Sequence, residues 1–193
     1  MYEAAVFLAE GFEEIEALSV IDILRRGCCE VISVSLTGGA YVTGSRAITV
    51  KADTAFEAFS QTPVPSEAAL ILPGGPGTAN LKTHSPLRAL LKQHNAAGGR
   101  IAAICAAPSV LGALGLLNGK KAVCYPGFEP ELEGALIGEN AVETDGNITT
   151  SKGPLTAAVF AFELLRILKG EAVSEKIRGQ MREAALKEYY ANA

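Results

Sequence analysis

The sequence predicts an α/β fold in which helices cover both faces of a mostly parallel, doubly wound sheet. Short apolar runs alternate with segments of helical period, the pattern of consecutive β-α-β units. These runs are apolar throughout rather than alternating, which is typical of strands buried on both faces. Trp is absent and aromatic residues are only 6% of the chain, so Ala, Val, Ile and Leu must build the core. The length fits a single domain, residues 1–193.

The first half of the chain predicts three buried strands, one long helix and a small β-ribbon. Ile15, Leu18 and Ile21 follow the helical period and predict the buried face of the helix, and Gly27 stands where a C-terminal cap belongs. We expect strands at residues 3–8, 31–36 and 68–72, the helix at 13–26, and the ribbon at 41–43 and 47–50.

The second half predicts further strand–helix units. Gly98 and Gly99 end a helix in which Leu87, Leu91 and His94 are spaced along one side. We expect strands at residues 101–104, 122–124 and 148–150, and helices at 86–97, 107–114, 154–168 and 174–190.

Charge and cysteine usage exclude several classes of protein. The net charge is −4 and the Lys and Arg residues are scattered, so we expect no nucleic-acid partner. No apolar run is long enough to span a bilayer, and no signal-peptide pattern begins the chain. The four cysteines have neither the spacing of a secreted disulfide framework nor that of a zinc site: Cys28, Cys29, Cys105 and Cys124. The sequence therefore predicts a reduced, cytoplasmic protein without a metal or an organic cofactor.

The segment from residue 101 to residue 108 (IAAICAAP) has the pattern of a nucleophile elbow. Such a turn places one reactive residue between a buried strand and a helix, and it needs small residues two positions before and two after. Ala103 and Ala107 occupy these positions around Cys105. A helix N-terminus at the sulfur would lower the pKa of the thiol, and the Ala106 amide would face a developing oxyanion. The alternative is that Cys105 is a small core residue, because free cysteine is often buried.

Two neighbouring motifs add to this hypothesis. Gly74 and Gly75 follow a buried strand, where a ligand can approach bare backbone amides in an open α/β sheet. A plain turn is the alternative. Glu13, Glu14 and Glu16 begin the first helix, and acidic residues there commonly complement the helix dipole. Glu16 flanks apolar positions, so we expect it to point inward, where burial beside a thiolate would keep it protonated.

Four segments of the chain resemble conserved motifs of one family. They are residues 8–16 (LAEGFEEIE), 72–75 (LPGG), 102–108 (AAICAAP) and 150–154 (TSKGP). In this order they are similar to the ThiJ/PfpI superfamily, and most similar to its branch of the parkinsonism-associated protein DJ-one and the bacterial YajL. The resemblance spans nearly the whole chain.

This resemblance implies a flavodoxin-like three-layer sandwich, usually a homodimer. It implies Cys105 as nucleophile, Glu16 as its carboxyl partner, and the amides of Gly75 and Ala106 as an oxyanion hole. Gly74 and Arg46 would lie at the pocket. The activities of this branch are cofactor-free glyoxalase, deglycation of proteins or nucleotides, and a redox-sensing or chaperone-like role.

The chain departs from the family pattern at two positions. A peptidase branch has His directly after the nucleophile, where this chain has Ala106, which disfavours a Cys–His hydrolase. A pocket His of the closest branch is replaced by Tyr125. The chain has two histidines, His84 and His94, and both fit structural positions on or near the helix at 86–97. Cys124 is either a resolving thiol for oxidised Cys105 or a buried strand residue, and we favour the second.

Three functions therefore remain from the sequence. The leading one is an enzyme that uses Cys105 to act on small α-oxoaldehydes or on their adducts. The second is a redox sensor or chaperone-like stress protein that responds to oxidation of Cys105. The third and weakest is an amidase-like or peptidase-like hydrolase.

Overall fold

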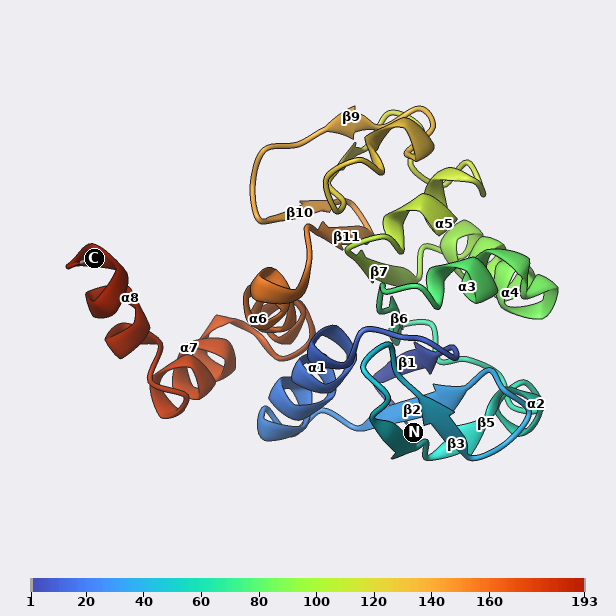
Figure 1. The fold of residues 1–193 in the computed structure, drawn as a ribbon, viewed down its shortest axis with the longest axis horizontal. Coiled ribbons are helices and arrows are strands. Elements are labelled where there is room, and N and C mark those ends of the chain that lie inside the picture. The colour runs from blue at the N-terminus through green and yellow to red at the C-terminus, as the bar shows by residue number, and fades with distance from the viewer. Residues whose placement is uncertain (1, 193) are drawn as a thin grey trace.

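A seven-stranded, mostly parallel sheet forms the centre of the computed structural model, which describes residues 2–192 (Figure 1). The strand order is β10-β11-β7-β6-β1-β2-β5, and β10 runs antiparallel to β11. The strands are β1 (Ala4–Leu8), β2 (Val31–Ser35), β5 (Thr54–Ala55), β6 (Ala69–Leu72), β7 (Arg100–Ile104), β10 (Val142–Asp145) and β11 (Ile148–Ser151). Two small sheets pair β3 (Tyr41–Thr43) with β4 (Thr49–Lys51), and β8 (Lys121–Ala122) with β9 (Leu136–Ile137).

Helices cover both faces of this sheet and complete three layers (Figure 1). Alternate residues of β1 point to opposite sides, with Val6 in one buried cluster and Phe7 in the other. One face is covered by α1 (Glu14–Arg26), α6 (Ala157–Lys169) and α7 (Glu171–Gln180). The other is covered by α2 (Phe56–Phe59), α3 (Thr78–Thr83), α4 (Ser85–Ala96) and α5 (Pro108–Gly112). The α/β sandwich with a small antiparallel ribbon is thereby confirmed.

The buried face of α1 differs from the prediction. Ile15 is 53% exposed and Leu18 is 38% exposed, whereas Ala17, Val20 and Leu24 are buried against α6. A Cβ at Gly27 would overlap the Leu165 side chain, so the close contact with α6 sets the rotation of α1. The predicted face was wrong because apolar side chains here also occupy the surface.

Other differences concern short elements and the C-terminus. The structure adds α2, α3, β5 and β10, and β8 pairs with β9 instead of joining the central sheet. The predicted helix at 174–190 is two helices, because Arg182 adopts a left-handed backbone (φ 64°) between α7 and α8 (Glu183–Ala191). None of the residues of α8 is buried, and the helix extends away from the sheet (Figure 1).

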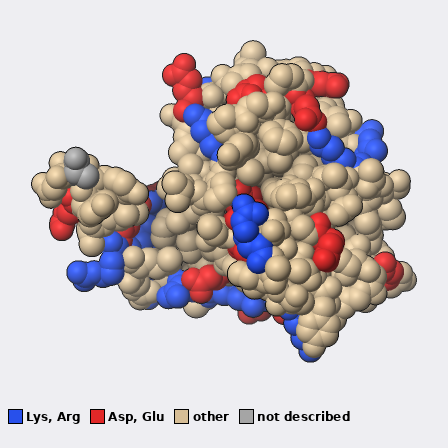
Figure 2. Space-filling model, viewed as in Figure 1, with Lys and Arg blue, Asp and Glu red and all other residues tan. Residues whose placement is uncertain are grey.

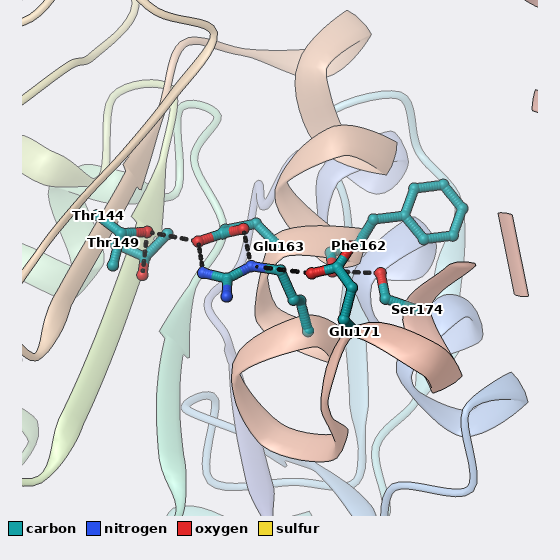
Figure 3. A network of polar contacts seen from close by, with 7 residues as sticks. Thr144, Thr149, Phe162, Glu163, Glu171 and Ser174 are labelled. Atoms are coloured by element: carbon teal, nitrogen blue, oxygen red, sulfur yellow. Dashed lines mark hydrogen bonds and ion pairs between the residues drawn. The ribbon is translucent and has the colours of Figure 1, made fainter. Parts of the chain in front are cut away.

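A polar network fixes α6 between the sheet and α7 (Figure 3). Thr144 on β10 donates to Glu163, and Arg166 makes two hydrogen bonds of 2.8 Å to the same carboxylate. The Ser174 hydroxyl on α7 donates to the Phe162 carbonyl at 3.0 Å. The pairing with Arg166 lowers the pKa of Glu163. These contacts hold α6 beside β10 and β11, so they support the strand that flanks Cys105.

Two surface features bear on possible partners. Lys and Arg form separate small groups among Asp and Glu on the face shown in Figure 2, without a broad basic patch. Among residues 2–192, no helix combines the length and apolar character needed to cross a bilayer.

Candidate active site

Cys105 lies on a sharp turn between β7 and α5. Its backbone is left-handed (φ 64°), a conformation that costs a non-glycine residue about 1–2 kcal/mol. Its N–H donates to the Ser151 carbonyl at 2.9 Å, and its carbonyl accepts from the Tyr125 N–H at 2.8 Å. The flanking Ala103 and Ala107 are fully buried, as a crowded elbow requires. Cys105 as a whole residue is 8% exposed, so the strained turn holds it almost completely buried.

Gly74 and Gly75 bring a second loop against this sulfur. A Cβ at Gly74 would lie 2.7 Å from the Cys105 Cβ and 2.9 Å from Oε2 of Glu16, so only glycine fits there. Gly75 has φ 87°, and a Cβ on it would lie 2.7 Å from the Glu13 nitrogen. The backbone amides of Gly75 and Ala106 act on the Cys105 thiol by hydrogen bonding in the direction that lowers its pKa. Two backbone amides from the ends of different strands therefore lie near the reactive atom.

Glu16 points inward from α1 and is fully buried. Its Oε2 accepts from the Gly74 N–H at 2.7 Å, and its Oε1 has no hydrogen-bond partner among the described residues. Burial raises the pKa of Glu16 to about 7, although the Gly74 amide and Cys105 act against this rise. The nearby charge of Glu13 adds to the rise. Glu16 is therefore a carboxyl group that takes up or releases a proton near neutral pH.

The thiol pKa moves in the opposite direction from the one expected. Burial and the Glu16 carboxylate raise the pKa of Cys105 to about 12, while the amides of Gly75 and Ala106 lower it. The expectation of a lowered pKa relied on a helix dipole, but α5 has only five residues. Two acids in contact cannot both ionise near neutrality, so they titrate as a pair. The pair loses one proton near pH 7 and retains the other.

Comparison with known proteins shows which family has this sequence and fold. The model of the DJ-1/PfpI family matches residues 2–167, which is most of the chain. The chain belongs to the DJ-1/PfpI family. Protein dj-1beta of Drosophila melanogaster is 38% identical over 180 residues, covering 91% of this chain and 95% of that protein. The structure of oxidised Toxoplasma gondii DJ-1 is 39% identical with a TM-score of 0.88, covering 94% of this chain and 98% of that one.

Two further relatives carry names that describe an activity. A protein of Pyrococcus abyssi named deglycase is 29% identical, covering 85% of this chain and 98% of that protein. The glutathione-independent glyoxalase DJR-1.2 of Caenorhabditis elegans is 32% identical, covering 83% of this chain and 85% of that protein. Similarity at this level establishes the DJ-1/PfpI family and its fold.

The side chains of Tyr125 and Cys124, both predicted near the pocket, have different surroundings in the structure. Tyr125 is half-exposed, and its backbone is bonded to Cys105. Cys124 is buried with Val110 and Leu132 in one core cluster, whereas the Cys105 side chain belongs to the other cluster. Burial also raises the pKa of Cys124 to about 11. Cys124 is therefore a buried core residue, as the favoured interpretation expects, but it lies after the end of β8 rather than in a strand.

Arg46 lies at the tip of the β3–β4 ribbon, held there by Glu14. The Arg46 N–H donates to Oε1 of Glu14 at 2.6 Å, and the Ser45 hydroxyl lies 3.0 and 3.1 Å from carboxylate oxygens of Glu13 and Glu14. The sequence analysis did not predict these hydrogen bonds to Glu13 and Glu14, because it assigned both glutamates to the helix dipole. The Arg46 guanidinium is exposed and contacts Ser45 only weakly, at 3.4 and 3.5 Å.

Both histidines have structural positions away from Cys105. Nδ1 of His84 accepts from the Leu87 N–H at 3.1 Å and caps α4. Nε2 of His94 is 2.9 Å from the Ala68 carbonyl, which fixes a ring that is almost completely buried. These placements agree with the prediction. An imidazole beside Cys105 is absent from the part of the chain that the structure describes, so a Cys–His hydrolase lacks its base.

Proposed function

We propose that this protein is a cofactor-free enzyme that uses Cys105 to convert α-oxoaldehydes, such as methylglyoxal, or their adducts on amines and thiols. One observation carries the proposal: the Cys105 sulfur, the Glu16 carboxyl and the amides of Gly75 and Ala106 converge at a nearly closed opening. The names of the deglycase and glyoxalase relatives support the same chemistry.

The first step is addition of sulfur to the aldehyde carbon. Glu16, ionised above about pH 7, accepts the Cys105 proton as the C–S bond forms. The amides of Gly75 and Ala106 hydrogen-bond the oxygen that becomes negative, and Glu16 returns the proton to it, which gives a hemithioacetal. Oε1 of Glu16, which has no hydrogen-bond partner within residues 2–192, is the atom available for these transfers.

The second step moves a proton between the two carbons of the substrate. Glu16 takes the proton from the former aldehyde carbon and returns it to the neighbouring carbon, while the hydroxyl proton of the hemithioacetal passes to the ketone oxygen, so the hemithioacetal becomes a thioester of lactate. Water then cleaves the thioester and regenerates the thiol. The net reaction adds one water to methylglyoxal and gives lactate, with no external oxidant or reductant.

Lactate release from methylglyoxal in the absence of glutathione tests this function. We expect turnover by the wild type and its loss in Cys105→Ser and Glu16→Gln. Cys28→Ser is the matched control, because Cys28 is the exposed cysteine at the end of α1. Equal release by the wild type and Cys105→Ser would show that the proposed mechanism is wrong.

A second candidate function, redox sensing, is favoured by the donors around the sulfur. Two amides and a protonated Glu16 would hydrogen-bond the oxygens of a sulfinate at Cys105. Two equivalents of peroxide supply these oxygens. Mass spectrometry after mild peroxide treatment distinguishes the two functions, because a sensor gains two oxygens at Cys105 and turns over no aldehyde.

We also propose a homodimer formed through the exposed apolar side chains of α1 and the start of α6. Ile15 and Leu18 on α1 face solvent, as do Leu155 (95% exposed) and Val159, and α1 packs against α6. Light scattering after size exclusion should give twice the chain mass, and Leu155→Asp should give the monomer. A wild-type monomer at micromolar concentration would refute this proposal.

Two further predictions from the sequence stay proposals. We propose that residues 1–193 form one domain, which one cooperative unfolding transition would support. We propose a cytoplasmic location, where reducing conditions keep the four cysteines as thiols. Cell fractionation tests the location.

A further inference from the structure

The backbone of Tyr125 is fixed on both sides by hydrogen bonds. Its N–H donates to the Cys105 carbonyl at 2.8 Å, and its carbonyl accepts from the Phe128 N–H at 3.1 Å. Pro126 and Gly127 lie between these two bonds, and Gly127 has φ 96°. Proline followed by a glycine of positive φ is the pattern of a type II turn. The peptide group of the nucleophile and a tight turn therefore set the position of this residue.

The Tyr125 ring lies against Gly153 at the rim of the site. A Cβ at Gly153 would be 3.2 Å from Cδ2 and 3.6 Å from Cε2 of Tyr125. Gly153 has φ 164°, an extended backbone that any residue adopts, so the ring accounts for the glycine. Gly153 follows Ser151 by two residues, and the Ser151 carbonyl accepts from the Cys105 N–H. The ring therefore lies between two segments whose backbones are both hydrogen-bonded to Cys105.

The exposure of the ring leaves aromatic surface open to a ligand. Tyr125 is 47% exposed, although its backbone is bonded to a nearly closed site. An aromatic ring stabilises a second flat ring by offset or edge-to-face contact. The exposed Tyr125 ring can therefore contribute by contacting a flat group of the substrate.

We propose that Tyr125 is a specificity-determining residue that favours α-oxoaldehydes with a flat aromatic substituent over methylglyoxal. The reacting aldehyde reaches Cys105, and the substituent on the second carbonyl lies against the Tyr125 ring. Methylglyoxal, with only a methyl group there, gains little from this contact. The proposal rests on the proposed function, because it assigns a substrate class to the same site.

The test compares kcat/KM for phenylglyoxal and methylglyoxal in the wild type and three variants. Tyr125→Leu removes the ring, Tyr125→Phe keeps it, and Tyr189→Leu removes an exposed ring on α8 as the control. We expect the phenylglyoxal-to-methylglyoxal ratio to fall about 3- to 10-fold in Tyr125→Leu, the size of one aromatic contact. The ratio should stay within about twofold in Tyr125→Phe and Tyr189→Leu.

Each other outcome overturns a specific claim. An unchanged ratio in Tyr125→Leu, with the wild type active, overturns the specificity role and leaves the enzyme intact. An equal fall for both substrates shows that Tyr125 acts only by holding the Cys105 turn. A wild type that turns over neither aldehyde overturns the proposed function and this inference together.

Discussion

Replacing Glu16 with Gln should remove a pH dependence from the stability of the protein. Glu16 is fully buried, and burial raises its pKa from 4.5 to about 7. A raised carboxyl pKa means that the folded state binds the proton more tightly than the unfolded state does. The stability that protonation contributes is therefore fully present below about pH 4.5 and is lost as the pH rises through about 7.

The size of this effect follows from the two pKa values. The gap between 4.5 and about 7, at 1.36 kcal/mol per pKa unit, gives about 3 kcal/mol of unfolding free energy. Gln resembles the protonated carboxyl in shape and carries no charge, and its amide oxygen can still accept from the Gly74 N–H. The variant should match the wild type near pH 4.5 within about 1 kcal/mol and exceed it by about 3 kcal/mol above pH 8.

Urea unfolding in reducing buffer at steps between pH 4.5 and pH 8.5 measures the difference between the two proteins. The same difference for Glu57→Gln, an exposed glutamate on α2, is the control and should be flat with pH. A constant difference for Glu16→Gln across this range, or a variant less stable than the wild type at pH 8.5, would refute the reasoning. Comparing variants at each pH removes the contribution of titrating groups that do not interact with Glu16.

Three further substitutions test the packing around the site and the fold. Gly74→Ala should reduce lactate release about 100-fold, because the new Cβ would lie 2.7 Å from the Cys105 Cβ. Circular dichroism should show that the fold is retained. Full activity of this variant would show that the contact between the Gly74 loop and Cys105 is not needed. Cys28→Gly should raise the free energy of urea unfolding by about 0.5–1 kcal/mol, because Cys28 (φ 58°) occupies the left-handed position after α1, and Cys28→Ala should bring no gain. Phe160→Ala on α6 should cost about 3–5 kcal/mol in the same assay, since its ring is fully buried; a cost under 1 kcal/mol would contradict the packing of α6 on the sheet.

The sequence predicted the sheet and the turn at Cys105 because these features are local. A wholly apolar run that ends in small residues defines the strand and its sharp exit, and Gly74 and Gly75 mark the facing loop. Glu16 points inward as expected, but only one of the apolar neighbours on which that expectation relied is buried: Ala17 is buried, whereas Ile15 faces solvent.

The remaining features depend on contacts between distant segments. Ile15 and Leu18 follow a helical period, but periodicity does not distinguish a core face from an exposed apolar face. Cys124 precedes Tyr125 in the chain, yet its side chain points into the opposite core cluster from Cys105. The pKa of Cys105 depends on Glu16, 89 positions away in sequence by their residue numbers, so no local pattern reveals it.

The rate at which iodoacetamide alkylates Cys105, followed from pH 5 to pH 10 by mass spectrometry, tests most directly whether Glu16 and Cys105 share one proton. If they do, the wild-type rate rises with an inflection near pH 7, where Glu16 becomes able to accept the thiol proton, and this inflection disappears in Glu16→Gln. Identical profiles for the two proteins, with a rise only above pH 9, would contradict the shared proton.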